Sequence, residues 1–252
     1  QSIDRVRSVA LPSALHTALL GRVRFTHDDG RQRVFSCMPA RGRVNVPRKM
    51  SPSVECQSDT RSAKAALRRP LRARRRAITA VARRVMDEKA QGHIIAHPWF
   101  NQAGVVALYR AFDGETATDL IASTAHALGK RVLYARIRQD APLDFVDPVA
   151  WRLGQGGLPI PRGPSVVLGD TDLIVVPGIA FDPCGHRLGM GGGHYDRTLR
   201  ATGAKAIGLS YELQRVSSLP LAHWDARLAA LATDVALHEF ENGESVSWLS
   251  TS

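Results

Sequence analysis

The segment TDLIVVPGIAF at residues 171–181 is almost continuously apolar, and five glycines follow it between Gly185 and Gly193. A run of this kind is typical of a β-strand that is covered on both faces, as happens in the middle of a parallel sheet. Parallel strands need long crossover connections, which are usually helices. The segment therefore restricts the chain to the α/β class, with helices packed on the faces of a sheet.

The neighbouring segments agree with this architecture. A helix is predicted over 118–130, with Thr118 as its N-cap and Gly129 near its end, and another over 195–203. Residues 138–169, which are rich in proline and glycine, are expected to form an irregular connection. Three further strands are predicted from VVALYRAF (105–112), RVLYARI (131–137) and AKAIGLSY (204–211). We predict an α/β fold, a three-layer, Rossmann-like open sheet of mostly parallel strands flanked by helices.

Residues 62–88 are predicted to form one helix that is rich in arginine. Apolar residues recur there at spacings of four, seven, three and four, which places them on one stripe. The stripe consists of Leu67, Leu71, Ile78, Val81 and Val85. Pro70 interrupts the pattern, because proline lacks an N–H donor and crowds the carbonyl of Ala66. We therefore expect the helix to kink at Pro70 or to begin near Arg69.

The net charge of +11 is unevenly distributed along the chain. Residues 1–60 contribute +5, residues 61–84 contribute +10, and residues 85–252 contribute −4. We predict a basic, disordered extension at 1–60, an α/β domain at 61–240 and a short tail at 241–252. The arginine-rich segment has no interleaved aromatic residue for base stacking, which argues against nucleic acid as a partner.

Composition also bears on the compartment. The chain has no uninterrupted run of about eighteen apolar residues, so we do not expect a membrane span. The three cysteines, Cys37, Cys56 and Cys184, include no CxxC pair and predict neither a disulfide framework nor a zinc site. These features favour a protein of the reducing cytoplasm.

The glycines of 185–193 lie between the predicted strand at 171–181 and the predicted helix at 195–203. Free N–H groups at a helix start favour an anion, and glycine backbone can approach a ligand closely. Arg187, Asp196 and Arg197 add the charges that a metal-bound phosphate requires, whereas a plain flexible turn is the alternative. The GxxxxGK[ST] pattern is absent, and His194 occupies a position where the dinucleotide fingerprint has glycine.

The string DLIVVPGIAFDPCGHRLGMGGGHYDR at 172–197 closely resembles the signature of the 5-formyltetrahydrofolate cyclo-ligase (methenyltetrahydrofolate synthetase) family. Other stretches resemble family motifs in the same order: KAALR at 64–68, FDGE at 112–115, Leu219-Pro220, Trp224-Asp225 and Thr233-Asp234. The resemblance covers about 61–240 and leaves out 1–60. It implies ATP-dependent closure of 5-formyltetrahydrofolate, polyglutamylated or not, to 5,10-methenyltetrahydrofolate with release of ADP and phosphate.

The resemblance further implies roles for single residues on the nucleotide side. Lys64, Arg68 and Arg187 would be catalytic and would bind ATP, although Lys64 and Arg68 could instead be solvated helix charges. Asp196 and Asp225 would hold Mg²⁺, unless Asp225 only caps a helix. The remaining ATP-binding residues would be Leu188, Gly189, Met190, Gly191, Gly192, Gly193, His194 and Tyr195.

On the substrate side, Glu115 would accept paired N–H donors from the pterin ring, with a simple loop acid as the alternative. The other substrate-binding residues would be Arg110, Met190, Gly191, Gly192, Gly193 and His194. His194 stands where the family commonly has tyrosine or phenylalanine, and Arg110 where it usually has an apolar residue. Residues 160–164 lack the glutamate of the family's Ile-x-Glu-Pro element.

Two other functions remain open from the sequence. One is a nucleotide-binding α/β scaffold with a basic, RNA-associating tail, and the other is a catalytically inactive folate-binding relative. We expect the chain to act as a monomer.

Overall fold

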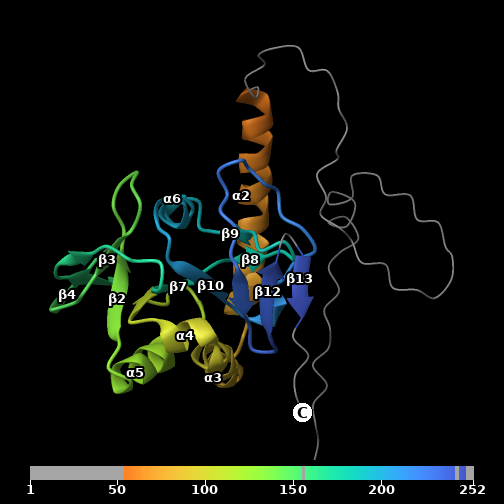
Figure 1. Cartoon of the computed structure of the whole chain (residues 1–252). Helices are drawn as coiled ribbons and strands as arrows, with labels where there is room; N and C mark the ends of the chain where they lie inside the picture. Colours follow the sequence, from red (N-terminus) through yellow and green to blue (C-terminus); the bar gives the residue numbers. More distant parts are fainter. Residues whose placement is uncertain (1–53, 155–156, 242–243, 248–252) are drawn as a thin grey trace, which may run out of the picture. The chain divides into compact units, whose positions relative to one another are not determined.

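A nine-stranded sheet runs through the structure in the order β13-β12-β11-β10-β7-β1-β2-β3-β6 (Figure 1). The structure is a computed structural model that describes residues 54–154, 157–241 and 244–247. Most of the predicted extension at 1–60 and part of the predicted tail at 241–252 therefore lie outside the described residues. The described elements begin at Val54 and end at Ser247, which is a wider span than 61–240.

Helices and strands alternate along the central part of the chain. The helices are α2 (Val54–Arg76), α3 (Ala80–Ala96), α4 (Pro98–Gln102), α5 (Asp119–Ala127), α6 (His194–Ala201) and the 3-10 helix η2 (Glu212–Gln214). The strands of the first half are β1 (Val105–Leu108), β2 (Arg131–Arg136), β3 (Asp144–Val146), β4 (Ala150–Leu153), β5 (Pro159–Arg162) and β6 (Ser165–Val166). Those of the second half are β7 (Leu173–Val176), β8 (Ala180–Phe181), β9 (Arg187–Leu188), β10 (Lys205–Leu209), β11 (Ala230–Ala232), β12 (Leu237–Glu241) and β13 (Glu244–Ser247).

The five central strands, β11, β10, β7, β1 and β2, pair in parallel. Antiparallel strands extend both edges, with β12 and β13 on one side and β3 and β6 on the other. The strands predicted from the sequence at 105–112, 131–137, 171–181 and 204–211 contain β1, β2, β7 and β10. The predicted α/β class with a mostly parallel central sheet is confirmed.

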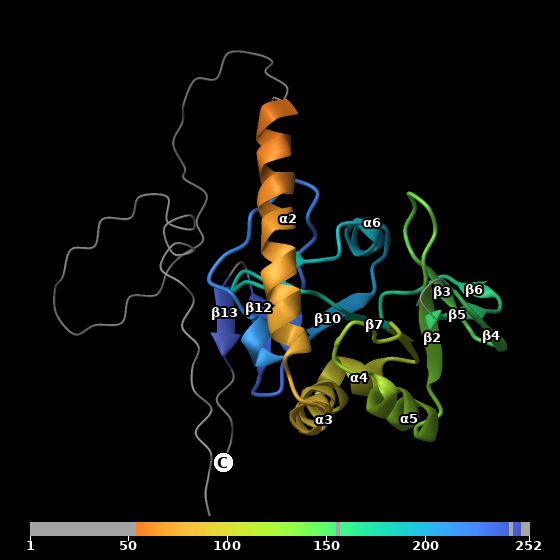
Figure 2. The same ribbon diagram turned by 180° about the vertical axis from the view of Figure 1, so that it is seen from behind.

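Both faces of the central strands are buried, as the apolar run at 171–181 predicts. Leu173 and Val175 face one core, whereas Ile174 and Val176 face the other, because successive strand residues point to opposite faces. Helices α3, α4 and α5 cover the first face, and α6 covers the second (Figure 2). No helix among the described residues is long and apolar enough to span a membrane.

The prediction of one helix over 62–88 was wrong. The chain forms two helices, α2 and α3, and Thr79 begins the second one by accepting a hydrogen bond from the amide of Ala82 at 3.3 Å. Leu67 and Leu71 of α2 pack against a small core, as the stripe predicts. Beyond the break, however, Val81 is 81% exposed. The break changes the rotational phase, so that other residues of α3 face the core.

Pro70 lies inside α2, so the predicted start near Arg69 was also wrong. The prediction of an irregular connection over 138–169 failed as well, because that segment contains β3 to β6. Strands β4 and β5 form a separate two-stranded ribbon, and all side chains of β4 are exposed, which leaves no alternation to detect in that strand.

The two ends of α5 follow the sequence prediction in position. Thr118 is the N-cap, but its hydroxyl donates to the carbonyl of Tyr109 at 3.0 Å instead of capping the helix. Gly129 adopts φ 70° just after the helix, where a left-handed residue is favourable for glycine. The Tyr109 hydroxyl donates in turn to the carbonyl of Thr116 at 2.6 Å. The loop between β1 and α5 is therefore fixed at both ends.

Candidate active site

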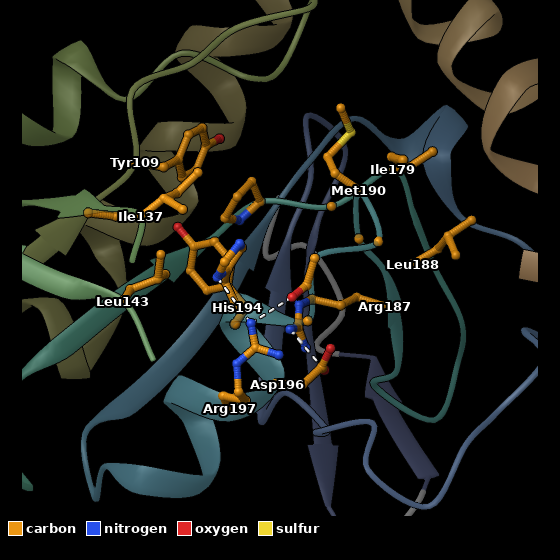
Figure 3. A pocket seen from close by; sticks show the side chains of 18 of the residues that line it. Tyr109, Ile137, Leu143, Ile179, Arg187, Leu188, Met190, His194, Asp196 and Arg197 are labelled. Carbon is orange, nitrogen blue, oxygen red and sulfur yellow. Dashed lines mark hydrogen bonds and ion pairs between the residues drawn. The ribbon is translucent and has the colours of Figure 1, made fainter. Parts of the chain in front are cut away.

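A cavity of about 760 Å³ opens at the carboxyl ends of β1, β2 and β7. This is the edge at which open α/β sheets bind ligands. Helix α2, the β4–β5 ribbon and the loop after β9 complete its walls. The structure places all the predicted site residues on this lining: Lys64, Arg68, Arg110, Glu115, Arg187, Leu188, Gly189, Met190, Gly191, Gly192, Gly193, His194, Tyr195, Asp196 and Asp225. Figure 3 shows side chains of the lining and labels ten of them, with Tyr109 and Ile137 on the opposite side of the view from Arg187 and Leu188.

The glycine loop, residues 189–193, joins the short strand β9 to the N-terminus of α6. Gly191 has φ 110° and Gly193 has φ 65°, backbone conformations that side chains rarely adopt. A Cβ on Gly192 would lie 2.7 Å from Cδ2 of His194. The positive φ angles favour glycine at 191 and 193, and a side chain at 192 would displace the His194 ring. The loop therefore brings bare backbone and the start of a helix to the cavity.

The turn before this loop is held by Asp182, which the sequence analysis did not single out. Its Oδ1 accepts hydrogen bonds from the amides of Cys184 at 2.9 Å and His186 at 3.0 Å. Gly185 closes the turn with φ 81°. The acid and the glycine of the DPCG stretch thus shape the β8–β9 hairpin that carries Arg187.

Arg187 is buried and braces the glycine loop against the segment 222–226. Its Nη2 donates to Oδ1 of Asp196 at 3.0 Å, and its Nη1 donates to the carbonyl of Ala226 at 3.2 Å. The amide of Ala226 donates to the same Asp196 oxygen at 3.1 Å. The guanidinium also lies over the ring of Tyr195, 5.7 Å from its centroid. This network fixes Arg187 and Asp196 side by side (Figure 3).

Lys64 and Asp225 form a second pair on the same lining. The ammonium group of Lys64 donates to Oδ2 of Asp225, and both side chains are largely buried. The same oxygen accepts the amide of Ala222 at 2.7 Å. No helix follows Asp225 before β11, so the alternative of a helix cap was wrong, and the carboxylate instead closes a turn.

Arg68, one turn along α2 from Lys64, reaches the glycine loop directly. Its Nε donates to the carbonyl of Gly189 at 2.9 Å. Burial lowers the pKa of its guanidinium, which nevertheless remains charged because arginine titrates far above neutral pH. Lys64 and Arg68 therefore point into the cavity, and the alternative of solvated helix charges does not describe them.

Glu115 is buried in the wall that faces the glycine loop, with 9% of its surface exposed. Removal from water raises the pKa of its carboxyl to about 7, against the opposing effect of the nearby Arg75 charge. The amide of Phe112 donates to its Oε2 at 3.3 Å. A buried carboxyl with a pKa near neutrality is characteristic of functional sites, so the simple loop acid is the weaker interpretation.

Arg110 and His194, both predicted to contact the substrate, lie on different walls of the cavity. The Arg110 guanidinium lies over the rings of Tyr134 and Trp151, at 5.7 and 5.5 Å from their centroids. His194 lies within 3.2 Å of Arg197, measured from its Nδ1 to Nη2. Arg110 thus belongs to the wall formed by β2 and the β4–β5 ribbon, and His194 to the glycine-loop wall.

Residues 60–234 match the 5-formyltetrahydrofolate cyclo-ligase family. The chain belongs to this family. The match contains every residue of the predicted site, from Lys64 to Asp225. It begins one residue before the predicted boundary at 61.

Individual members of the cyclo-ligase family resemble the chain over most of their own length. The 5-formyltetrahydrofolate cyclo-ligase of Haemophilus influenzae is 32% identical over 181 residues, covering 64% of this chain and 92% of that enzyme. The Escherichia coli K12 cyclo-ligase is 30% identical, covering 68% and 100%. The solved structure of Aquifex aeolicus 5,10-methenyltetrahydrofolate synthetase superposes with a TM-score of 0.62 at 28% identity, covering 74% of this chain and 97% of that one.

Proposed function

We propose that this member of the cyclo-ligase family catalyses the ATP-dependent conversion of 5-formyltetrahydrofolate to 5,10-methenyltetrahydrofolate, releasing ADP and phosphate. One observation carries the assignment. A single cavity joins a cation-rich glycine loop at a helix start with a buried carboxyl of raised pKa, Glu115. The first part suits the phosphates of a nucleotide, and the second suits the N–H donors of a pterin ring.

The nucleotide phosphates would bind between α2 and the glycine loop. Lys64, Arg68 and Arg187 supply three cations there, and the backbone of residues 188–193 supplies amide donors. Two of these cations, Lys64 and Arg187, are paired with the acids Asp225 and Asp196. Phosphate can replace the acids as partner of the cations, since it presents several oxygens to each charge.

The same two acids would hold Mg²⁺. The two acids lie near each other in the fold, because Asp196 accepts a hydrogen bond from the amide of Ala226, the residue after Asp225. No group of three or more potential metal ligands occurs among the described residues, but Mg²⁺ commonly takes one or two carboxylates and completes its shell with phosphates and water. The donor set therefore fits. Bound there, Mg²⁺ would neutralise charge on the transferred phosphoryl group.

The folate would occupy the other part of the cavity. Glu115 would accept the paired N–H donors of the pterin, and Met190 with the flat ring of His194 would contact its faces. The formyl oxygen would attack the γ-phosphorus as the bond to ADP breaks. The folate's nitrogen 10 would then attack the activated carbon, lose its proton and expel phosphate. Positioning of the two reactants and cation contacts to the phosphates are the main contributions required of the protein.

The remaining alternatives receive little support from the described residues. Several arginines of 61–84 point inward, among them Arg68 and Arg75, and are not available to a nucleic acid surface. Ile160 and Pro161, where the family's glutamate is missing, line the cavity. The assay below tests whether the chain is an inactive folate-binding relative. We further propose that the chain acts as a monomer in the cytoplasm and accepts polyglutamylated folate.

The test is a spectrophotometric assay of the purified chain with 5-formyltetrahydrofolate, ATP and Mg²⁺. We expect the near-ultraviolet absorbance of the methenyl product to grow only when all three are present. Omission of ATP and chelation of the metal are the controls. Absence of signal from folded protein that binds 5-formyltetrahydrofolate would contradict catalysis and favour an inactive relative.

A further inference from the structure

Three arginines of α2 form a cluster with the carboxylates of Asp113 and Glu115, in the wall of the cavity that carries Glu115. Arg75 is completely buried, whereas Arg72 and Arg76 are partly exposed. All three contact Asp113, with Arg72 Nε at 2.7 Å and Arg75 Nη2 at 3.3 Å from Oδ2, and Arg76 in contact with Oδ1. Although burial acts in the opposite direction, the hydrogen bonds and charges of Arg72 and Arg76 lower the pKa of Asp113. Three cations and two carboxylates leave a charge of +1.

Arg75 links this cluster to two parts of the cavity lining without lining the cavity itself. Its Nη1 donates to the carbonyl of Gly178 at 3.2 Å, and its Nη2 donates to the carbonyl of Asp113 at 2.9 Å. The Nη1 atom also lies 3.9 Å from Oε1 of Glu115. The guanidinium therefore connects the end of β7 with the loop that carries Glu115.

The burial of Arg75 is unfavourable for the fold alone. Its Nε finds no hydrogen-bond acceptor within the part of the chain that the structure describes. The unmade hydrogen bond adds to the cost of removing this cation from water, and replacing a whole buried ion pair by apolar side chains of similar volume is often neutral or stabilising. A buried cation at this position thus points to a role beyond packing.

We propose that Arg75 is a positioning residue that keeps the carboxyl of Glu115 ionised and oriented to accept the N–H donors of the substrate. This inference rests on the proposed function. Arg75 acts through Glu115 and contacts neither substrate. A nearby positive charge favours the ionised form of a carboxyl, whereas burial favours the neutral form.

Other ionisable groups near Glu115 do not replace this charge. Arg72 on α2 contributes a weaker attraction and Asp113 a repulsion. Tyr109 at the end of β1 and Tyr195 on α6 face the same region, and burial first, then the Glu115 charge, raises the pKa of both, so they remain neutral near pH 7. Arg75 is therefore the principal group that opposes protonation of Glu115.

The test is calorimetric binding of 5-formyltetrahydrofolate without ATP, from about pH 6 to about pH 9, which spans the pKa of Glu115. In the wild type, affinity should fall as Glu115 becomes protonated on the acid side of about pH 7. Arg75→Gln should move this fall to higher pH by about one unit or more and weaken binding roughly tenfold near pH 7, with recovery at the alkaline end. Arg75→Lys should restore part of the shift.

Two further variants separate this role from a structural one. Asp113→Asn removes a repulsive charge from Glu115, so the fall should move to lower pH, and asparagine tolerates the φ of 54° at this position. Glu115→Gln should abolish the fall, and adding Arg75→Gln to it should then change the affinity little. Arg74→Gln, on the exposed side of the same helix, is the matched control.

The outcomes distinguish the inference from the function on which it rests. Wild-type protein that does not bind 5-formyltetrahydrofolate contradicts the proposed function. If Arg75→Gln binds more weakly at every pH, but its affinity falls at the same pH as that of the wild type, the inference is overturned. Arg75 then has only a structural role. If Arg75→Gln does not fold, Asp113→Asn takes its place in the test. A loss of affinity at the same pH as in the wild type would then overturn the inference.

Discussion

The two walls of the cavity are built in different ways. The glycine-loop wall is braced by buried ion pairs and by backbone conformations that only glycine readily adopts. The ribbon wall, formed by β2 and the β4–β5 ribbon, includes strand β4, which is exposed along its whole length. On this wall the Arg110 guanidinium lies over the rings of Tyr134 and Trp151. We infer that the first wall is preorganised for phosphates, whereas the second can adjust to the substrate.

The largest expected effect is on the glycine-loop wall, at Arg187. Arg187→Ala removes a charge-assisted contact worth about 1.5–3 kcal/mol, so kcat/KM for ATP should fall roughly ten- to a hundredfold. The change also leaves Asp196 without its ion-pair partner. Steady-state kinetics with ATP as the varied substrate measure the effect.

Arg215→Ala is the control. Arg215 forms an ion pair with Glu212, with 2.6 Å between Nη1 and Oε1, and neither residue lines the cavity. This partly exposed pair should contribute at most about 1 kcal/mol. Unchanged ATP kinetics in Arg187→Ala would remove Arg187 from the nucleotide site and weaken the contrast between the walls.

A smaller effect is expected at Gly191, where the backbone rather than a charge is tested. Gly191→Ala places a side chain at φ 110° and 3.4 Å from Cζ of Arg68. Strain of this kind costs about 1–2 kcal/mol, so KM for ATP should rise about tenfold and the melting temperature should decrease. Gly189→Ala is the matched variant, because a Cβ there meets no atom within 4 Å and the backbone has no positive φ.

Thermal unfolding without ligand separates the two glycines. Gly189→Ala should melt as the wild type does, whereas Gly191→Ala should melt at a lower temperature. Equal melting temperatures in the two variants would mean that the loop is not preorganised, and that its glycines serve only to admit the ligand.

The two walls also differ in how far the sequence predicts them. The glycine loop could be predicted because the buried strand, the glycines and Arg187 occupy one continuous stretch, so local rules apply to all of it. Arg75 could not be recognised, since its partners Asp113 and Gly178 are distant in sequence and nothing distinguishes it from the neighbouring arginines. Strand β4 of the ribbon was missed because its exposed side chains produce no alternation of apolar and polar residues. The break at Thr79 was missed because arginines on every face allowed an apparent stripe to continue across it.

The smallest effect is expected on the ribbon wall, at Trp151. Trp151→Ala removes one of the two rings beside Arg110 and an edge-to-face contact with Tyr134 at 5.0 Å. A cation–π contact at an exposed site contributes about 0.5–1 kcal/mol, so KM for 5-formyltetrahydrofolate should rise about two- to fivefold while KM for ATP stays constant. Leu153→Ala, at an exposed position on the same strand, should change neither value. A parallel rise in both KM values would show that the ribbon supports the whole cavity, and the two walls would then have to be regarded as one unit.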